Sequence, residues 1–310
     1  MSKAWRFRLE AAAATLVSAL VRPLPRRFVL GLGRALGSVW AALDPRHRRI
    51  AVDNLRPSFT DWDAQRLDRV ARGVYRHFGA TVLDLLWMQG RSAQELLSLA
   101  DVEGVENARA PLARGKGVIY CTAHIGNWEL HGLVHGPTIG ALSLVARPLD
   151  NPALDRRLVA LRAITGNRIV YKKKALATVL RDLRSGRGVA FLLDQNVQAQ
   201  DGIFVDFFGR KAATTTVAAA LALKTGCAIV PCWTELREDG RYLLRYEPEL
   251  PVHPGADRDA EIVRITQAIA SRTETWVRQK PEQWLWIHRR WKTVAVSSQL
   301  SAISDARSRS

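Results

Sequence analysis

The sequence predicts an α/β fold, in which a mostly parallel or mixed central sheet is flanked by helices on both faces. Strand-like and helix-like patterns alternate between about residue 105 and residue 278. The strand candidates are short apolar runs, as expected for buried strands. Several of these runs end in polar or charged residues, and the functional loops of an open α/β sheet lie at such strand ends.

The N-terminal segment, residues 1–50, is basic. It carries ten lysines and arginines against two acidic residues. Its two apolar stretches, Ala11–Val21 and Phe28–Leu43, are shorter than the roughly 20 apolar residues that a membrane crossing needs, and Arg34 interrupts the second. We therefore expect basic, amphipathic helices that lie in the inner leaflet of a membrane, without a cleavable signal. A helical hairpin packed on the core and a tilted single pass are the alternatives.

Residues 51–296 are predicted to form the α/β domain, and residues 297–310 a disordered tail. Asp61–Gln89 has helical spacing with its apolar residues on one side, and Val105–Arg114 follows as a short helix. Further strands are expected at residues 142–147, 168–171, 189–194, 228–236 and 242–246, the last two as a hairpin, and further helices at 151–165, 175–184, 215–225 and 257–278.

The stretch around His124 is predicted to form a strand, a tight loop and the start of a helix. Gly117–Tyr120 is the apolar strand, Gly126 is a turn residue, and Asn127 is a good helix N-cap. His124 on this loop can take a proton from a hydroxyl. A carboxylate on its other ring nitrogen, which we expect to be that of Glu129, would fix the tautomer and stabilise the imidazolium. The N–H groups at the helix start suit a negatively charged oxygen. A partly buried histidine bonded near a helix cap is the alternative.

Polar residues also follow other predicted strands: Arg147, Asp194 with Gln195, and more weakly Glu235. Because strand ends of an open sheet gather at one edge, we expect His124, Arg147 and Asp194 to meet in one crevice. Arg147 can bind a phosphate or carbonyl oxygen through two hydrogen bonds, and Asp194 can orient an arginine or a substrate hydroxyl. A structural ion pair or a helix cap is the alternative role for each.

Two aromatic stretches accompany these residues. Gly202–Arg210 has too many apolar residues for a plain loop, and we expect it to line the site, to form a short edge strand whose phenylalanines fill the core, or both. Pro281–Lys292 interleaves aromatic with basic residues. It fits an interfacial belt over anionic headgroups, a surface for single-stranded nucleic acid, or a segment packed in the core whose arginines pair with aspartate or glutamate.

The net charge indicates an anionic partner. Lys+Arg 46 against Asp+Glu 29 gives +17, which favours nucleic acid, a membrane surface, or an acidic substrate or carrier protein. Ten tryptophans favour the membrane among these. The three cysteines, Cys121, Cys227 and Cys232, lie in apolar surroundings and indicate reduced thiols.

Other classes of function fit the sequence less well. Glu129, His131 and His135 share a helix face but lack the His-Glu-x-x-His arrangement of a zinc helix. A thiol nucleophile at Cys121 would stand inside an apolar strand, and no Gly-x-Ser-x-Gly motif of a serine hydrolase occurs. A nucleic-acid-binding protein would explain the charge, but not the polar strand ends or the apolar N-terminal stretches.

Taken together, these motifs resemble those of the lipid A biosynthesis acyltransferases, the secondary or late acyltransferases of the lysophospholipid acyltransferase superfamily. Glu129 stands where the superfamily often has aspartate, and it adds one methylene of reach. The ordered series spans about residues 5–293 and consists of His124 to Glu129, Arg147-Pro148 with Asn151-Pro152, Arg162 with Gly166, Asp194-Gln195, Phe207-Phe208-Gly209 with Ala212 and Thr214, and residues 281–286 with residues 288–292.

The resemblance implies a fold like that of the glycerol-3-phosphate acyltransferases. It implies transfer of a fatty acyl chain from acyl carrier protein to a hydroxyl of an anionic glycolipid such as a lipid A precursor, with another glycolipid or a lyso-lipid as the alternative acceptor. It also implies peripheral attachment to the cytoplasmic face of the inner membrane, and no metal, cofactor or nucleic acid. In this scheme His124 is the general base and Glu129 its partner, and the residues that bind substrate are Asn127, Arg147, Arg162, Asp194, Gln195, Phe208 and Gly209.

Overall fold

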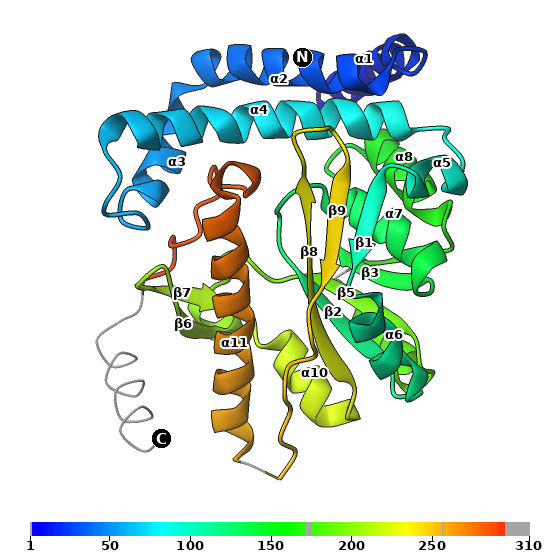
Figure 1. Cartoon of the computed structure of the whole chain (residues 1–310), viewed down its shortest axis with the longest axis vertical. Coiled ribbons are helices and arrows are strands. Elements are labelled where there is room, and N and C mark those ends of the chain that lie inside the picture. The colour runs from blue at the N-terminus through cyan, green and yellow to red at the C-terminus, as the bar shows by residue number, and fades with distance from the viewer. Residues whose placement is uncertain (1, 172–174, 256, 295–310) are drawn as a thin grey trace.

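The computed structural model describes residues 2–171, 175–255 and 257–294. Within them, seven strands form one sheet in the order β1-β9-β8-β2-β5-β3-β4, and every neighbouring pair is parallel except β8 and β9. The predicted α/β fold with a mostly parallel sheet is therefore confirmed (Figure 1). The strands are β1 (Ala100–Glu103), β2 (Val118–Thr122), β3 (Leu142–Ala146), β4 (Arg168–Tyr171), β5 (Gly188–Leu192), β8 (Ala228–Leu236) and β9 (Tyr242–Tyr246).

The central strand β2 is buried on both faces. Val118 and Tyr120 pack into the core on one side of the sheet, and Ile119 and Cys121 pack on the other. This alternation follows from the period of two along a strand. Because β2 pairs in parallel with both β5 and β8, the carboxyl ends of all three strands lie at the same edge of the sheet.

Helices cover both faces of the sheet, as predicted. Apolar residues of α9, α10 and α11 form the core on the face that contains Ile119, while those of α6 and α7 pack on the opposite face (Figure 1). The helices of these two layers and their neighbour α8 are α6 (Val105–Ala113), α7 (Trp128–Thr138), α8 (Pro152–Ala163), α9 (Ala175–Arg184), α10 (Val217–Thr225) and α11 (Arg258–Gln279).

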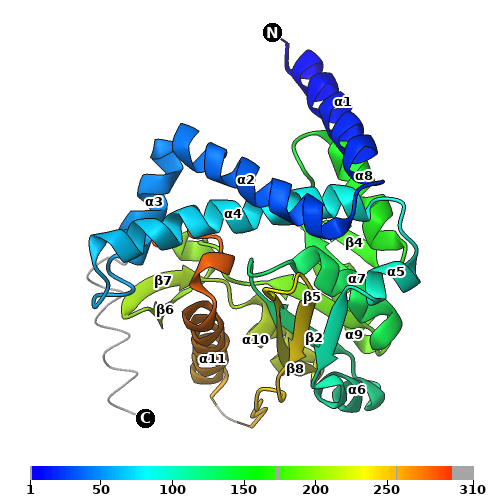
Figure 2. The same ribbon diagram turned by 45° about the horizontal axis from the view of Figure 1, so that its top comes forward.

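The long helix α4 crosses the edge at which the parallel strands end, and α2 lies along its outer side (Figure 1). The two helices pack so closely that a Cβ on Gly37 would lie 2.2 Å from the carbonyl oxygen of Tyr75, so this crossing requires glycine. Figure 2 shows α1 projecting away from the body of the molecule. The N-terminal helices are α1 (Lys3–Val21), α2 (Arg26–Leu43), α3 (Pro45–Leu55), α4 (Ala64–Met88) and α5 (Ala93–Leu97).

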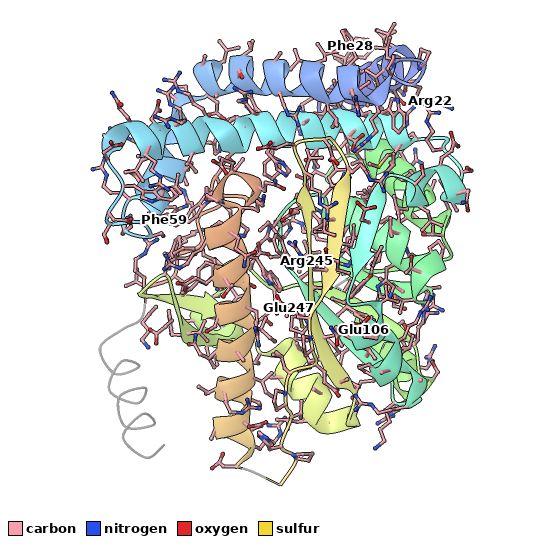
Figure 3. The ribbon with its side chains drawn as sticks, viewed as in Figure 1. Arg22, Phe28, Phe59, Glu106, Arg245 and Glu247 are labelled. Atoms are coloured by element: carbon pink, nitrogen blue, oxygen red, sulfur yellow. The ribbon has the colours of Figure 1, made fainter. Side chains whose placement is uncertain are left out.

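The outer faces of α1 and α2 are apolar and exposed. Phe28 stands on the outer face of α2, with 59% of its surface exposed (Figure 3). None of the described helices is both long enough and apolar enough to span a membrane. The other large apolar side chains exposed on these two helices are Trp5, Leu9, Leu16, Leu20, Leu36, Val39, Trp40 and Leu43.

The aromatic stretches fill the core. The segment at residues 202–210 belongs to an antiparallel hairpin of β6 (Ile203–Phe207) and β7 (Arg210–Thr214), in which Phe207 and Phe208 are buried. Trp284 and Trp286 of the C-terminal segment are also buried. Arg290, beside them, donates to backbone carbonyls at residues 195 and 213 rather than to a headgroup. The packed interpretation is therefore correct for these two tryptophans, which cannot form an interfacial belt, whereas Arg290 bonds backbone carbonyls and not the aspartate or glutamate that this interpretation expected.

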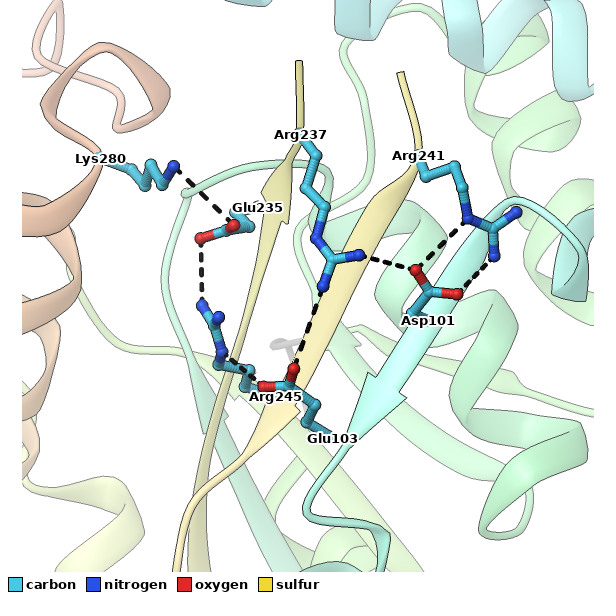
Figure 4. A network of polar contacts seen from close by, with 7 residues as sticks. All are labelled: Asp101, Glu103, Glu235, Arg237, Arg241, Arg245 and Lys280. Carbon is cyan, nitrogen blue, oxygen red and sulfur yellow. Dashed lines mark hydrogen bonds and ion pairs between the residues drawn. The ribbon is translucent and has the colours of Figure 1, made fainter. Parts of the chain in front are cut away.

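Strand β1 was not predicted, because its sequence is polar. Asp101 and Glu103 on β1 form ion pairs with Arg237, Arg241 and Arg245 of the β8–β9 hairpin (Figure 4). These contacts accompany the parallel ladder between β1 and β9, so charge pairing takes the place of an apolar pattern at this edge of the sheet.

The domain boundaries stay a prediction. The proposed division at residue 50 falls within α3, and the predicted tail at residues 297–310 lies outside the described residues.

Candidate active site

The loop between β2 and α7 is sharply bent. β2 ends at Thr122, α7 begins at Trp128, and His124 lies between them. Gly126 has a φ of +61°, and a Cβ there would lie 1.8 Å from the carbonyl oxygen of Thr234. Both facts require glycine at this position, which confirms the predicted strand, tight loop and helix start.

Neighbouring segments fix this loop in place. The N–H of Gly126 donates to the carbonyl of Gln283 at 3.0 Å, and the N–H of Leu285 donates to the carbonyl of His124 at 3.2 Å. The Nε2 of His77, on α4, donates to the carbonyl of Gly126 at 3.0 Å. Burial lowers the pKa of His77 to about 4, so this ring is neutral and holds the loop as a hydrogen-bond donor.

The imidazole of His124 is held by the carboxylate of Asp194. Nδ1 lies 2.8 Å from Oδ1 of Asp194, and the backbone N–H of His124 donates to Oδ2 at 2.8 Å. The indole N–H of Trp284 donates to the same Oδ2 at 2.7 Å. On the other side of the ring, Nε2 lies 3.4 Å from the side-chain nitrogen of Gln195. The ring is therefore fixed in orientation, with its side chain 18% exposed.

The electrostatics of this pair favour one protonation pattern. Burial opposes ionisation of Asp194, but the charge of His124 and the hydrogen bonds from His124 and Trp284 outweigh it and lower the pKa of Asp194 to about 2. An ionised carboxylate only accepts hydrogen bonds, so in the uncharged form of the ring Nδ1 of His124 carries the proton and Nε2 has the lone pair. Such a ring can accept a proton at Nε2 and is stabilised when it becomes charged.

The structure corrects the expected partner of His124. Glu129 was expected on the ring nitrogen, but Asp194 bonds Nδ1. The carboxylate of Glu129 instead accepts two hydrogen bonds from Arg162, at 2.7 and 2.6 Å, and one from the indole of Trp128 at 3.1 Å. The physical reason is that the first turn of α7 lies beside α8, which brings the largely buried guanidinium of Arg162 to Glu129, and a buried cation requires a carboxylate.

The other predicted strand-end residues are only partly brought together. β2, β5 and β3 are neighbours, so His124, Asp194 and Arg147 do follow adjacent strands. The side chain of Arg147, however, is 80% exposed and pairs with Asp150. Glu235 forms ion pairs with the arginine and lysine at positions 245 and 280, which is the structural role given as its alternative (Figure 4).

The remaining predicted substrate-binding residues lie in supporting positions. Asn127 is fully buried and caps α7, since its Oδ1 accepts the N–H of Leu130 at 3.0 Å. Phe208 and Gly209 form the turn between β6 and β7, where the ring of Phe208 packs against Trp286. These residues thus shape the loop and the packing behind the site.

An apolar cavity adjoins the His124 loop. It is lined by residues of the sheet and of α7 and is partly open to solvent. Trp128, whose ring lies edge-on to that of His124 at 5.0 Å, lines it together with Glu129 and Arg162. Most of the remaining lining is apolar and comes from β2, β3 and β5, namely Tyr120, Leu142, Leu144, Val145, Ala146, Ala190 and Leu192.

The geometry is unfavourable to the metal and thiol alternatives. In the part of the chain that the structure describes, no group of three histidine, cysteine or acidic side chains is arranged to hold a metal ion. His131 and His135 bond the hydroxyls of Thr234 and Tyr246 through Nδ1, at 2.9 and 2.8 Å. Burial raises the pKa of the Cys121 thiol well above its ordinary value, which disfavours the nucleophilic thiolate.

Sequence reasoning missed two features of the site. It did not assign Asp194 to His124, although both follow strands that proved to be neighbours. It also missed Trp284 as a donor to Asp194. The signal for the first was the predicted convergence of strand ends, whereas nothing in the local sequence around Trp284 indicated its partner.

Comparisons with known proteins found one family match and several relatives. The bacterial lipid A biosynthesis acyltransferase family matches residues 3–293. A lipid A biosynthesis lauroyltransferase of Escherichia coli K12 is 27% identical over 283 residues, 88% of each chain. A phosphatidylinositol mannoside acyltransferase of Mycolicibacterium smegmatis is 27% identical over 208 residues, 65% of this chain and 64% of that protein. Among solved structures, the 1-acyl-sn-glycerophosphate acyltransferase PlsC of Thermotoga maritima aligns with a TM-score of 0.40 and 15% identity, covering 84% of this chain and 100% of that one.

Proposed function

The chain belongs to the bacterial lipid A biosynthesis acyltransferase family, and we propose that it moves a fatty acyl chain from acyl carrier protein to a hydroxyl of an anionic glycolipid of the lipid A precursor class. The observation that carries this proposal is the bonded pair of His124 and Asp194 beside Trp128, a residue that lines an apolar cavity. A base of this kind suits an alcohol acceptor, and the cavity suits a hydrocarbon chain.

In the proposed reaction, Nε2 of His124 takes the proton of the acceptor hydroxyl. The oxygen attacks the carbonyl carbon of the thioester, the carbon–sulfur bond breaks, and the imidazolium returns the proton to the leaving thiolate. Asp194 stabilises the imidazolium in between. General base catalysis of this kind contributes a factor of roughly 100 to 10,000. N–H groups at the start of α7 are proposed to stabilise the oxyanion that forms on the carbonyl.

We assign Glu129 to a role beside the base rather than on it. Its two hydrogen bonds hold Arg162 at the cavity lining, so the remaining N–H groups of this guanidinium can bind a carbonyl or phosphate oxygen. Arg147, which is exposed at the end of β3, is proposed to contact an anionic group of the acceptor. Gln195 is close enough to Nε2 of His124 to contact the reacting hydroxyl.

The acyl chain is proposed to occupy the apolar cavity, with its carbonyl near His124. The lining of the cavity is predominantly apolar, and it begins at the residues on either side of the His124 loop, Thr122 and Trp128. Burial of each methylene from water contributes about 0.8 kcal/mol, which favours this site over solvent for a fatty chain.

The N-terminal helices are proposed to lie on the cytoplasmic face of the inner membrane. This is supported by the exposed apolar side chains of α1 and α2, among them Trp5, Phe28 and Leu36, and by the basic residues of the N-terminal segment other than Arg26, which is paired with Asp84. The opposite side of α2 packs on α4, so these helices would attach the enzyme to the bilayer surface without crossing it.

Acyl carrier protein is proposed as the donor because carrier proteins are acidic and this chain carries a net charge of +17. Opposite charges accelerate encounter, and salt screens the attraction. The relative named phosphatidylinositol mannoside acyltransferase supports a second class of acceptor, a glycolipid with a different sugar headgroup, through the same chemistry.

The experiment is a transfer assay with purified protein. Acyl carrier protein or coenzyme A thioesters are offered with a lipid A precursor, a phosphatidylinositol mannoside or a lysophospholipid, and the products are identified by mass spectrometry. The proposal expects an ester on a glycolipid hydroxyl, with faster transfer from the carrier protein. Transfer to lysophospholipid alone would reject the acceptor class, and absence of transfer from every thioester would reject the proposed function.

A further inference from the structure

A buried chain of hydrogen bonds joins α2 to the loop that carries His124. Nε and Nη2 of Arg26 donate to the two carboxylate oxygens of Asp84, at 2.7 and 2.8 Å. The hydroxyl of Tyr242 donates to Oδ2 of Asp84 at 2.8 Å, and the side-chain amide of Asn127 donates to that hydroxyl at 3.2 Å. We propose that these four residues, here called the relay, are positioning residues that couple the seating of α2 to the geometry of the His124 loop.

The direction of every bond in the relay is fixed by chemistry. Arg26 only donates, so the paired carboxylate of Asp84 accepts. The hydroxyl of Tyr242 has one hydrogen, which it gives to Asp84, and so it accepts from Asn127. The amide nitrogen of Asn127 therefore points to Tyr242, and its oxygen points to the N–H of Leu130. Because Asp84, Tyr242 and Asn127 are fully buried, a member that turned away would leave a polar group unpaired.

The relay ends at the residue that starts α7. Asn127 caps this helix three residues after His124, and Gly126 before it is held by His77. His77 and Asp84 are seven residues apart on α4, so they lie on the same side of that helix. α4 thus holds the loop directly through His77 and indirectly from Asp84 through Tyr242, and the position of His124 relative to a substrate depends on both.

The relay begins at the first residue of α2. Arg26 also donates from Nη1 to the carbonyl of Gly240 at 2.5 Å, and its guanidinium lies over the ring of Tyr242, 5.1 Å from the centroid. Phe28, two residues further along α2, is on the outer face proposed to contact the membrane. The side chain of Arg26 therefore connects α2, the helix proposed to lie on the bilayer, to the β8–β9 hairpin. Tyr242 of this hairpin in turn contacts Asn127 at the site.

The test compares two variants that each remove one buried tyrosine hydroxyl. Tyr242→Phe breaks the relay, whereas Tyr75→Phe removes a hydroxyl on α4 that donates to the carbonyl of Asp44 at 3.4 Å, outside the relay. Because small misplacement of reacting groups is costly, we expect Tyr242→Phe to lower kcat about tenfold with KM within about twofold, while Tyr75→Phe keeps kcat within about twofold. Tyr242→Phe also leaves buried groups of Asp84 and Asn127 without this partner, so it should unfold at a lower denaturant concentration than Tyr75→Phe. Both variants are therefore assayed without denaturant, after circular dichroism has checked that they are folded.

A second measurement does not depend on activity. Amide hydrogen exchange of residues 126–131 should be about tenfold faster in Tyr242→Phe than in wild type, and unchanged in Tyr75→Phe. Arg26→Lys, which keeps the charge but loses the two-point contact with Asp84, should also accelerate exchange in this segment although it lies on α2.

The kinetic test of the relay rests on the proposed acyl-transfer function. Failure of the relay and failure of that function give different results. If wild type transfers acyl chains but Tyr242→Phe has the same kcat and the same exchange, the relay is not a positioning device. Equal losses in Tyr242→Phe and Tyr75→Phe would likewise reduce it to ordinary core packing. If wild type transfers nothing, the function is rejected, while the exchange experiment with Arg26→Lys and Tyr242→Phe still decides the relay.

Discussion

Nδ1 of His124 and Oδ1 of Asp194 lie 2.8 Å apart, although the two residues are seventy positions apart in the sequence. They meet because β2 and β5 are parallel neighbours whose carboxyl ends share one edge of the sheet. This relationship gives the proposed base its tautomer and its orientation, and the first prediction follows from it.

Asp194→Asn is expected to lower kcat about 10⁴-fold with the fold intact, as for other imidazoles that lose an orienting carboxylate. The N–H groups of His124 and Trp284 require an oxygen in the Oδ2 position, so the amide nitrogen would face Nδ1. The ring would then carry its proton on Nε2 and could not accept another from a substrate. Steady-state transfer kinetics and circular dichroism check this. Asp68→Asn, at an exposed ion pair, is the control, and a kcat near wild type in Asp194→Asn would contradict the assignment.

The ion pair of Glu129 and Arg162 is expected to contribute to the stability of the fold, because removing one partner leaves the other charge buried. Glu129→Ala leaves a largely buried guanidinium without its carboxylate and should lower the free energy of unfolding by about 3–5 kcal/mol. The double variant Glu129→Leu with Arg162→Leu removes both charges and should recover most of this loss. Urea unfolding measures both. A double variant less stable than Glu129→Ala would show that the pair itself, rather than the orphaned charge, sets the cost.

Acid is expected to weaken the fold through buried histidines. Burial lowers the pKa of His77 to about 4, whereas the unfolded value is about 6.5. Between these values the unfolded chain binds the proton, so stability is complete above about pH 6.5 and falls as the pH decreases. His77 alone should cost about 2 kcal/mol between pH 6.5 and pH 5. His77→Gln retains a donor for the carbonyl of Gly126 and should reduce this pH dependence in urea unfolding; an identical slope would show that His77 titrates normally.

Membrane attachment is expected to depend on the outer face of α2. Removing the helix would uncover Val29 and Leu30, which are buried, so surface substitutions are the sharper test. Phe28→Gln with Leu36→Gln should weaken binding to anionic phospholipid vesicles at least tenfold, roughly what partial burial of two such side chains contributes. Val263→Gln, an exposed apolar residue on α11, is the control. Vesicle flotation that is unchanged in the double variant would place attachment elsewhere.

The sequence predicted those parts of the fold that depend on apolar periodicity. The buried run of β2, the long helix α4 and the β8–β9 hairpin all have patterns that follow from local geometry. β1 escaped prediction because its polar residues pair with arginines of the adjacent hairpin, and those contacts exist only in the folded chain.

The site was predictable in its residues but not in its pairing. His124, Glu129, Arg162 and Asp194 were all singled out, yet the sequence favoured Glu129 as the partner of His124 because it is close along the chain. The actual partner depends on the order of strands in the sheet, which puts β5 next to β2. The bond from Trp284 to Asp194 was equally hidden, since packing in the core was one of three interpretations of its segment and did not indicate a partner.

The most direct test of the account is the single-turnover rate of acyl transfer by His124→Ala, measured with saturating acyl carrier protein thioester and glycolipid. If His124 deprotonates the acceptor, the rate falls by roughly 100- to 10,000-fold while both substrates still bind. A variant that remains folded and transfers the chain within about tenfold of the wild-type rate would contradict the central claim.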